Sequence, residues 1–166
     1  MKNKTPRNKS NVPSRQPKVQ PIPPSASSSI PAGNKFYKNI IESIEDYCVF
    51  TTDKKGIINS WSAGAENILG YAEKEILGRS MEVLYTAADR RAEKPGQELR
   101  IAKARGRATN ERWHIRKDKT LFWGSGLVFP LKDERERWLG FTKIMRDLTE
   151  RKKWEQRLLE NESFNR

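Results

Sequence analysis

The chain has 166 residues, a formal net charge of +12 and 33% charged residues, with one cysteine and one histidine. Its length allows one ordinary domain with tails. A single cysteine excludes an internal disulfide and a thiolate metal cluster, and no run of about 20 apolar residues could span a membrane. We therefore expect a cytoplasmic protein, and the basic balance favours nucleic acid, acidic lipid or an acidic protein as a partner.

The first 33 residues contain six Lys or Arg, no acidic residue, and frequent Pro and Ser. Such a composition cannot bury enough apolar surface to offset chain entropy, so we predict a disordered basic tail over residues 1–33. Two interpretations stay open, a solvated leader or an arm that binds nucleic acid or acidic lipid. The tail has no aromatic residue to stack on bases, which argues against binding to single strands.

Hydrophobic periodicity and turn residues divide the rest of the chain into short strands and helices. The predicted strands cover residues 47–52, 57–61, 107–117, 121–131 and 138–146. The predicted helices cover residues 34–46, 63–69, 72–77, 86–94, 97–104, and a last segment that begins at 147 or 149 and ends near 160. Ser62 is suited to cap the second of these helices. Cys48, in the first strand, is expected to be a small buried hydrophobe, and the alternative is a redox role, which would need an exposed and electropositive setting.

The only histidine, His114, lies in the third predicted strand. Alternation places Trp113 and Ile115 on one face of this strand, and His114 on the other face with two arginines. We therefore expect His114 in solvent. Gly124 and Gly126 lie two apart on the next strand and share one face, which we predict to be the face of Trp113 and Ile115. These four residues either line a small-molecule pocket or belong to a closely packed core.

Several short motifs, taken in order, resemble the PAS sensor family over roughly residues 36–153. They are YCVFTTDKKGIINSWSAGAE (47–66), ILGY (68–71), EILGR (75–79), RKD (116–118), FW (122–123), PL (130–131), LGF (139–141) and DLTER (147–151). The family commonly has Gly after the Asp of the RKD turn, where this chain has Lys119. If the turn keeps a positive φ there, the cost is roughly 1 kcal/mol.

The resemblance implies an α+β PAS fold, with a five-stranded antiparallel sheet, helices on one face, and flanking N- and C-terminal helices. It divides the chain into a sensor domain at residues 34–148 and a signalling helix at 149–166. It also implies that Asp147, Leu148 and Thr149 join the sensing sheet to an output helix. A population shift in the sheet would pass along the final strand to that helix.

The implied function is a sensory or interaction module rather than an enzyme. The residues agree, because the sequence has no catalytic triad arrangement, phosphate loop or metal-ligand spacing. The implied partners are a second copy of the chain or a signalling protein such as a histidine kinase. The alternative is a nucleic-acid-associated protein that binds through residues 1–33.

The resemblance also bears on cofactors. Haem-binding PAS proteins usually carry the iron ligand on a helix before the third strand, and this chain has no histidine there, so haem is not expected. Cys48 does not lie in the Asn-Cys-Arg motif of the photoactive flavin branch, so covalent flavin chemistry is not expected. A non-covalent flavin, another small ligand and no ligand at all stay open.

Overall fold

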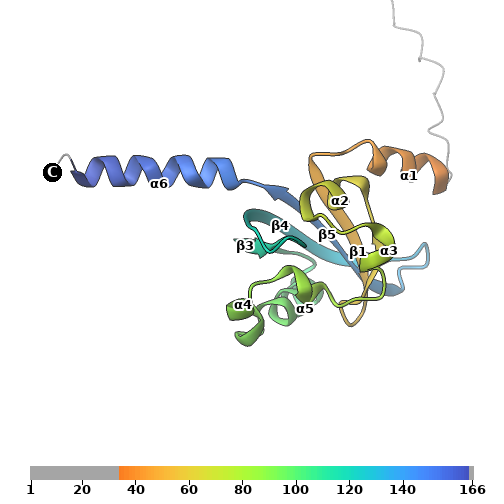
Figure 1. Cartoon of the computed structure of the whole chain (residues 1–166). Helices are drawn as coiled ribbons and strands as arrows, with labels where there is room; N and C mark the ends of the chain where they lie inside the picture. Colours follow the sequence, from red (N-terminus) through yellow and green to blue (C-terminus); the bar gives the residue numbers. More distant parts are fainter. Residues whose placement is uncertain (1–33, 165–166) are drawn as a thin grey trace, which may run out of the picture. The chain divides into compact units, whose positions relative to one another are not determined.

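A computed structural model describes residues 34–164. The predicted basic tail at 1–33, with its nucleic-acid contacts, lies outside the described residues, as do the last two residues of the predicted signalling helix. The described chain forms a five-stranded antiparallel sheet in the order β2-β1-β5-β4-β3 (Figure 1). This is the predicted α+β architecture.

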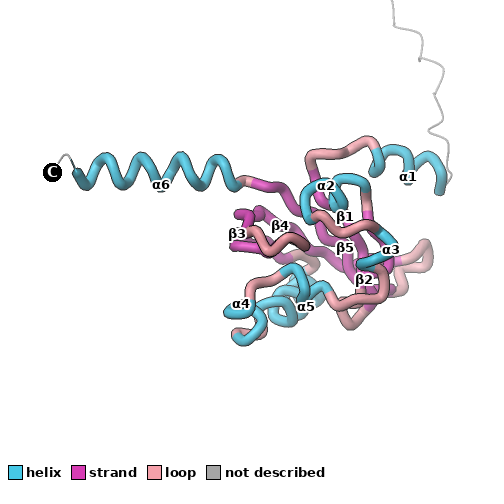
Figure 2. The backbone as a smooth tube through the Cα atoms, in the orientation of Figure 1, coloured by secondary structure: helices cyan, strands magenta, loops and turns pink. Residues whose placement is uncertain are grey.

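All predicted strands are present, with ends that differ by one or two residues. Figure 2 shows the strands and the helices in separate colours. The strands are β1 (Tyr47–Asp53), β2 (Ile58–Trp61), β3 (Ala108–Ile115), β4 (Leu121–Lys132) and β5 (Trp138–Asp147). The helices are α1 (Asn34–Glu42), α2 (Ala63–Leu69), α3 (Glu73–Ile76), the 3₁₀ turn η1 (Met81–Leu84), α4 (Ala87–Arg91), α5 (Lys94–Arg105) and α6 (Thr149–Phe164).

Several helix ends differ from the prediction: α1 ends at Glu42 rather than at residue 46, and α6 continues to Phe164 rather than ending near 160. Between these, the prediction ended a helix near Lys94 and began the next at Gln97. In the structure α4 ends at Arg91 and α5 begins at Lys94, with Pro95 in its first turn. Proline is well tolerated there, because first-turn N–H groups have no partner within the helix. The break falls instead at Glu93, whose φ is +55°.

The β1–β2 hairpin runs directly into α2. Asp53 Oδ1 accepts hydrogen bonds from the backbone N–H of Lys55 (2.8 Å) and Ile57 (2.9 Å), which closes the turn. Ser62 Oγ then accepts from the N–H of Ala65 at 3.1 Å and caps α2 as predicted. The hairpin and helix therefore form one local unit.

Gly64 in α2 lies against the chain segment that enters β1. A Cβ atom at this position would lie 2.7 Å from the carbonyl oxygen of Ile44 and closer still to that of Tyr47. Both neighbours are backbone atoms, which cannot rotate away. A residue without a side chain is therefore required for α2 to pack here.

We predict that Gly64→Ala destabilises the protein by about 1–3 kcal/mol, the usual range for overpacking. Urea unfolding followed by tryptophan fluorescence measures this loss. Gly96→Ala, in helix α5, is the matched control, because the nearest atom to its Cβ is the flexible Arg100 guanidinium at 3.2 Å. The control should be neutral or stabilising, since alanine favours helix. Equal free energies of unfolding for the two variants would contradict the close approach.

The core lies between one face of the sheet, here called the inner face, and the helices α2, α3 and α5 with η1. Its apolar side chains are almost fully buried and form two clusters. The larger includes Phe50, Trp61, Leu69, Tyr85, Phe122 and Met145, and the smaller Ala102, Val128 and Phe141. The burial of Cys48 (0% exposed) confirms its prediction as a buried hydrophobe, and burial raises the pKa of its thiol.

The two flanking helices expose apolar side chains. In α1, Tyr37 is 55% exposed and Ile40 43%. The helix α6 continues from β5 and projects away from the sheet (Figure 1), and its Trp154 and Leu158 are more than 60% exposed. Among residues 34–164, no helix has the length and apolar character needed to cross a membrane.

Candidate functional site

The start of α6 is fixed to the sheet by its first residues. Asp147 Oδ1 accepts from the backbone N–H of Thr149 at 2.9 Å and from its hydroxyl at 2.5 Å, so Asp147 caps the helix. Thr149 Oγ1 in turn accepts from the backbone N–H of Trp123 at 3.0 Å. The backbone N–H of Leu148 donates to the Trp123 carbonyl at 2.7 Å. The first turn of α6 is thereby attached to β4.

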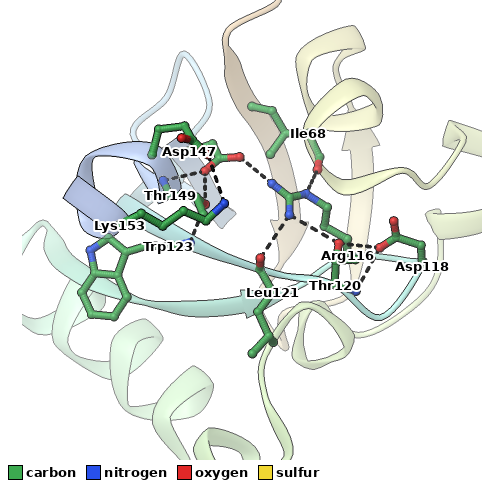
Figure 3. A network of polar contacts seen from close by, with 10 residues as sticks. Ile68, Arg116, Asp118, Thr120, Leu121, Trp123, Asp147, Thr149 and Lys153 are labelled. Carbon is green, nitrogen blue, oxygen red and sulfur yellow. Dashed lines mark hydrogen bonds and ion pairs between the residues drawn. The ribbon is translucent and has the colours of Figure 1, made fainter. Parts of the chain in front are cut away.

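Arg116, just after β3, connects this turn to the helical layer. Its Nη2 lies 2.5 Å from Asp147 Oδ2, and its Nε donates to the Ile68 carbonyl at the end of α2, at 2.9 Å. Nη1 donates to the Leu121 carbonyl at 3.2 Å. Figure 3 shows the guanidinium among these groups, which come from α2, β4 and β5. We call Arg116, Asp147, Leu148 and Thr149 the junction.

The geometry of the junction couples three parts of the fold. Asp147 uses one carboxylate oxygen for the helix cap and the other for Arg116, and charge-assisted bonds of this kind are the stronger ones. A movement of α2 shifts the Ile68 carbonyl and so disturbs Arg116. The structure thus brings the three predicted residues Asp147, Leu148 and Thr149 together, and adds Arg116, whose part in the junction was not predicted.

A groove of about 1050 Å³ lies beside the junction. Its lining comes from the α1–β1 loop, α2, β3, β4, β5 and α6. The lining includes the acidic residues Glu45, Asp46 and Glu150 and the basic residues Arg146 and Lys153. The groove therefore offers a mixed polar surface next to the residues that hold α6.

The residues around Gly124 and Gly126 differ from those predicted to line a pocket with them. The two glycines are buried on the inner face, as expected for residues two apart. The prediction that Trp113 and Ile115 share this face is wrong. Gly124 pairs with Arg112 and Gly126 with Asn110, and directly paired residues of antiparallel strands point to the same side. Trp113 instead packs against Trp123 on the outer face, with ring centroids 5.2 Å apart.

The expectation that His114 lies in solvent is also wrong, since its side chain is fully buried on the inner face. Its Nδ1 lies 3.1 Å from the Leu84 carbonyl. The ring packs between Tyr85 and Phe122, with centroids 5.0 and 5.4 Å away, and a Cβ at Gly124 would lie 2.8 Å from its edge. The residues as arranged do not fit a haem on His114, because aromatic rings occupy the space beside it.

Burial lowers the pKa of His114 to about 3 from its usual 6.5, and the nearby Lys143 acts in the same direction. The ring is therefore neutral at physiological pH, and Nδ1–H donates to the Leu84 carbonyl. We predicted a solvent-exposed His114 because Arg112 and Arg116 lie on the same face of the strand, and arginines are usually exposed. Here they are paired with carboxylates, which removes the basis of that prediction.

The low pKa of His114 predicts a pH dependence of stability. Because the unfolded chain takes up this proton first, stability should be lost as pH falls from about 6.5 towards 3. His114→Asn, whose amide also donates, lacks this titration. The wild-type free energy of unfolding should fall relative to that of the variant by up to about 1.4 kcal/mol per pH unit. Urea unfolding of both proteins across this range measures the difference, and parallel curves would contradict it.

A buried ionic network lies beside His114 and was not predicted. Lys143 of β5 is 1% exposed, and its Nζ lies 2.8 Å from Glu98 Oε2 and 2.6 Å from Tyr85 Oη. Tyr85 Oη donates to the same Glu98 oxygen at 2.7 Å. Glu98 Oε1 faces Arg112 Nε at 3.1 Å and accepts from the Asn110 amide. Glu98 of α5 thus connects β3, β5 and the segment after η1.

Burial acts on the titration of this network. It lowers the pKa of Lys143, while the Glu98 carboxylate works against that shift. It raises the pKa of Tyr85 well above its usual value, so the phenol stays protonated and donates. The sequence feature that could have indicated this network is Lys143, which lies at an inward position of β5 between Phe141 and Met145.

Comparisons with known proteins agree with this architecture. A sequence profile described as a PAS domain matches residues 46–150. Two-component system protein A of Emericella nidulans is 38% identical over 122 residues, which cover 74% of this chain and 18% of that protein. The chain therefore corresponds to less than a fifth of that relative.

Solved structures show the same fold. The PAS domain of a protein from Colwellia psychrerythraea has a TM-score of 0.64 at 22% identity, covering 70% of this chain and 97% of that one. An RNA-binding light-oxygen-voltage receptor has a TM-score of 0.66 at 22% identity, covering 87% of this chain and 41% of that one. The profile match over most of the chain shows that this protein belongs to the PAS domain family.

Proposed function

We propose that the chain is a sensory module of a two-component signalling system and passes a change in its sheet to a partner through α6. The observation that carries this proposal is the junction, in which Asp147 both caps α6 and pairs with Arg116. The relative named as a two-component system protein supports the signalling context. We propose no catalytic role, and the output is delivered by contact.

The mechanism is a population shift between two arrangements of the core. A ligand or partner that binds one arrangement better stabilises it by its difference in affinity. Movement of the helical layer reaches Arg116 through the Ile68 carbonyl, and reaches β5 through the contact of Glu98 with Lys143. Both routes end at Asp147, which holds the first turn of α6.

The partner is a second copy of the chain, a histidine kinase, or both. The apolar side chains of α1, Tyr37, Ile40 and Ile41, are exposed in the single chain and suit a helical contact in a homodimer. Sedimentation of the full chain tests this part. The wild type should form a dimer that Ile40→Glu with Ile41→Glu dissociates, and a monomeric wild type would contradict it.

The signalling proposal is tested by fusing the full chain, through its C-terminal end, to the catalytic region of a histidine kinase. Asp147→Ala should change autophosphorylation at least about fivefold, the low end of typical coupling energies. Asp133→Ala is a matched control, because Asp133 also accepts backbone N–H groups and pairs with an arginine, Arg137, but in the β4–β5 loop. Equal rates in wild type and both variants would refute the proposal.

A further inference from the structure

A second groove, of about 300 Å³, lies where α5 leads into β3. Three of the eight residues that line it are arginines, Arg105, Arg107 and Arg112. The others are Gln97, Glu98, Ile101, Ala108 and Thr109. The volume is at the lower end of the range for small-molecule sites. We call this the arginine groove.

The lining of the arginine groove carries more positive than negative charge. Arg105 and Arg107 are exposed on either side of Gly106, and among residues 34–164 neither forms an ion pair with a carboxylate. The one carboxylate in the lining is Glu98, which already pairs with the buried Lys143 at 2.8 Å. An anion in the groove would therefore meet an excess of positive charge.

Arg112 is the buried end of this groove. Its guanidinium lies 3.4 Å from Asp89 and 3.1 Å from Glu98, and its side chain is 19% exposed. Its Nε is the atom that faces Glu98, so these carboxylates hold the guanidinium in place beside the groove.

We propose that the arginine groove binds a small anion that carries one or more phosphate groups. Guanidinium groups match phosphate oxygens with paired N–H donors, and three of them suit a multiply charged anion better than a single carboxylate. The Gln97 amide and the Thr109 hydroxyl supply further polar groups in the same lining. This site is separate from the junction and does not depend on the proposed signalling role.

Binding there also has a route into the core. An anion competes with Glu98 for Arg112, and Glu98 is the acceptor that holds Lys143 of β5. Weaker pairing of Arg112 leaves the Glu98 charge more available to Lys143, four residues before Asp147. This consequence rests on the proposed function, whereas the binding itself does not.

The test is calorimetric titration of pyrophosphate into the full chain, at an ionic strength fixed with sodium chloride so that screening is constant. The wild type should bind one equivalent saturably. Arg105→Gln with Arg107→Gln should weaken binding about tenfold or more, which is 1.4 kcal/mol. Lys55→Gln with Arg135→Gln removes the same charge from exposed positions elsewhere and should bind as the wild type does.

Three outcomes would overturn the proposal. They are the absence of saturable binding to the wild type, equal weakening in both double variants, and unchanged binding in the Arg105 and Arg107 variant.

Phosphate groups are also presented by acidic lipids. Sedimentation with phosphatidylcholine vesicles, with and without phosphatidic acid, separates the two sources. Binding to the vesicles with phosphatidic acid but not to pyrophosphate would refute the small-anion assignment.

Discussion

Replacing Glu98 by leucine is expected to destabilise the protein by about 3–5 kcal/mol, the cost of breaking a buried ion pair. The variant would leave the ammonium of Lys143, 1% exposed, with only the Tyr85 hydroxyl at 2.6 Å. Such a charge has lost its compensating carboxylate in a place that water does not reach. Urea unfolding followed by tryptophan fluorescence measures the loss.

Two controls sharpen this prediction. Removing both charges, in Glu98→Leu with Lys143→Met, should recover much of the stability, because no unpaired charge is left buried. Lys132→Ala with Glu136→Ala breaks a pair of 2.9 Å whose side chains are 50% and 80% exposed, and should cost at most about 1 kcal/mol. If Glu98→Leu costs no more than this surface control, the buried network does not stabilise the fold as described.

Asp147→Ala is expected to loosen the start of α6 while the sheet stays folded. The variant removes the helix cap on Thr149 and the partner of Arg116. Loss of a cap costs about 0.5–2 kcal/mol. One to two kcal/mol corresponds to roughly 5- to 30-fold faster local exchange. Amide hydrogen exchange of residues 148–153, read by mass spectrometry or NMR, measures this directly.

Asp133→Ala provides the comparison for exchange as well, because the same kind of contacts are lost in the β4–β5 loop. It should leave residues 148–153 unchanged. Amides in β1, which contacts β5 but not the junction, should be protected equally in wild type and Asp147→Ala. Faster exchange throughout the sheet would indicate global destabilisation and contradict a local role for Asp147.

Features that depend on a few neighbouring residues could be predicted from the sequence. Ser62 caps α2, Gly70 ends it with φ +80°, and Lys119 takes φ +72° in the turn where the family commonly has Gly. Each is decided by local backbone chemistry. The positions of the strands along the chain and the α+β class followed from such signals and from the motif resemblance.

The inner face could not be predicted in this way. Alternation correctly separated Trp113 from His114, but it does not say which set faces the core. We assigned the face that carries His114 and the arginines to solvent, because polar residues are usually exposed. This assignment turned the wrong face of β3 toward the core. The face with the arginines can lie inward because Arg112 pairs with Glu98 and Arg116 pairs with Asp147, which lies 31 positions away in the sequence. A contact so distant in sequence leaves no trace in periodicity.

The central claim is that the state of the core reaches α6 through Asp147. The most direct test is a double-mutant cycle, read by exchange of the Leu148 and Lys152 amides, which donate at the junction. Tyr85→Phe removes a hydroxyl that contacts both Lys143 and Glu98 in the core. The account predicts that this change alters exchange at both amides, and that the effect disappears in an Asp147→Ala background. No effect of Tyr85→Phe, or the same effect in both backgrounds, would contradict it.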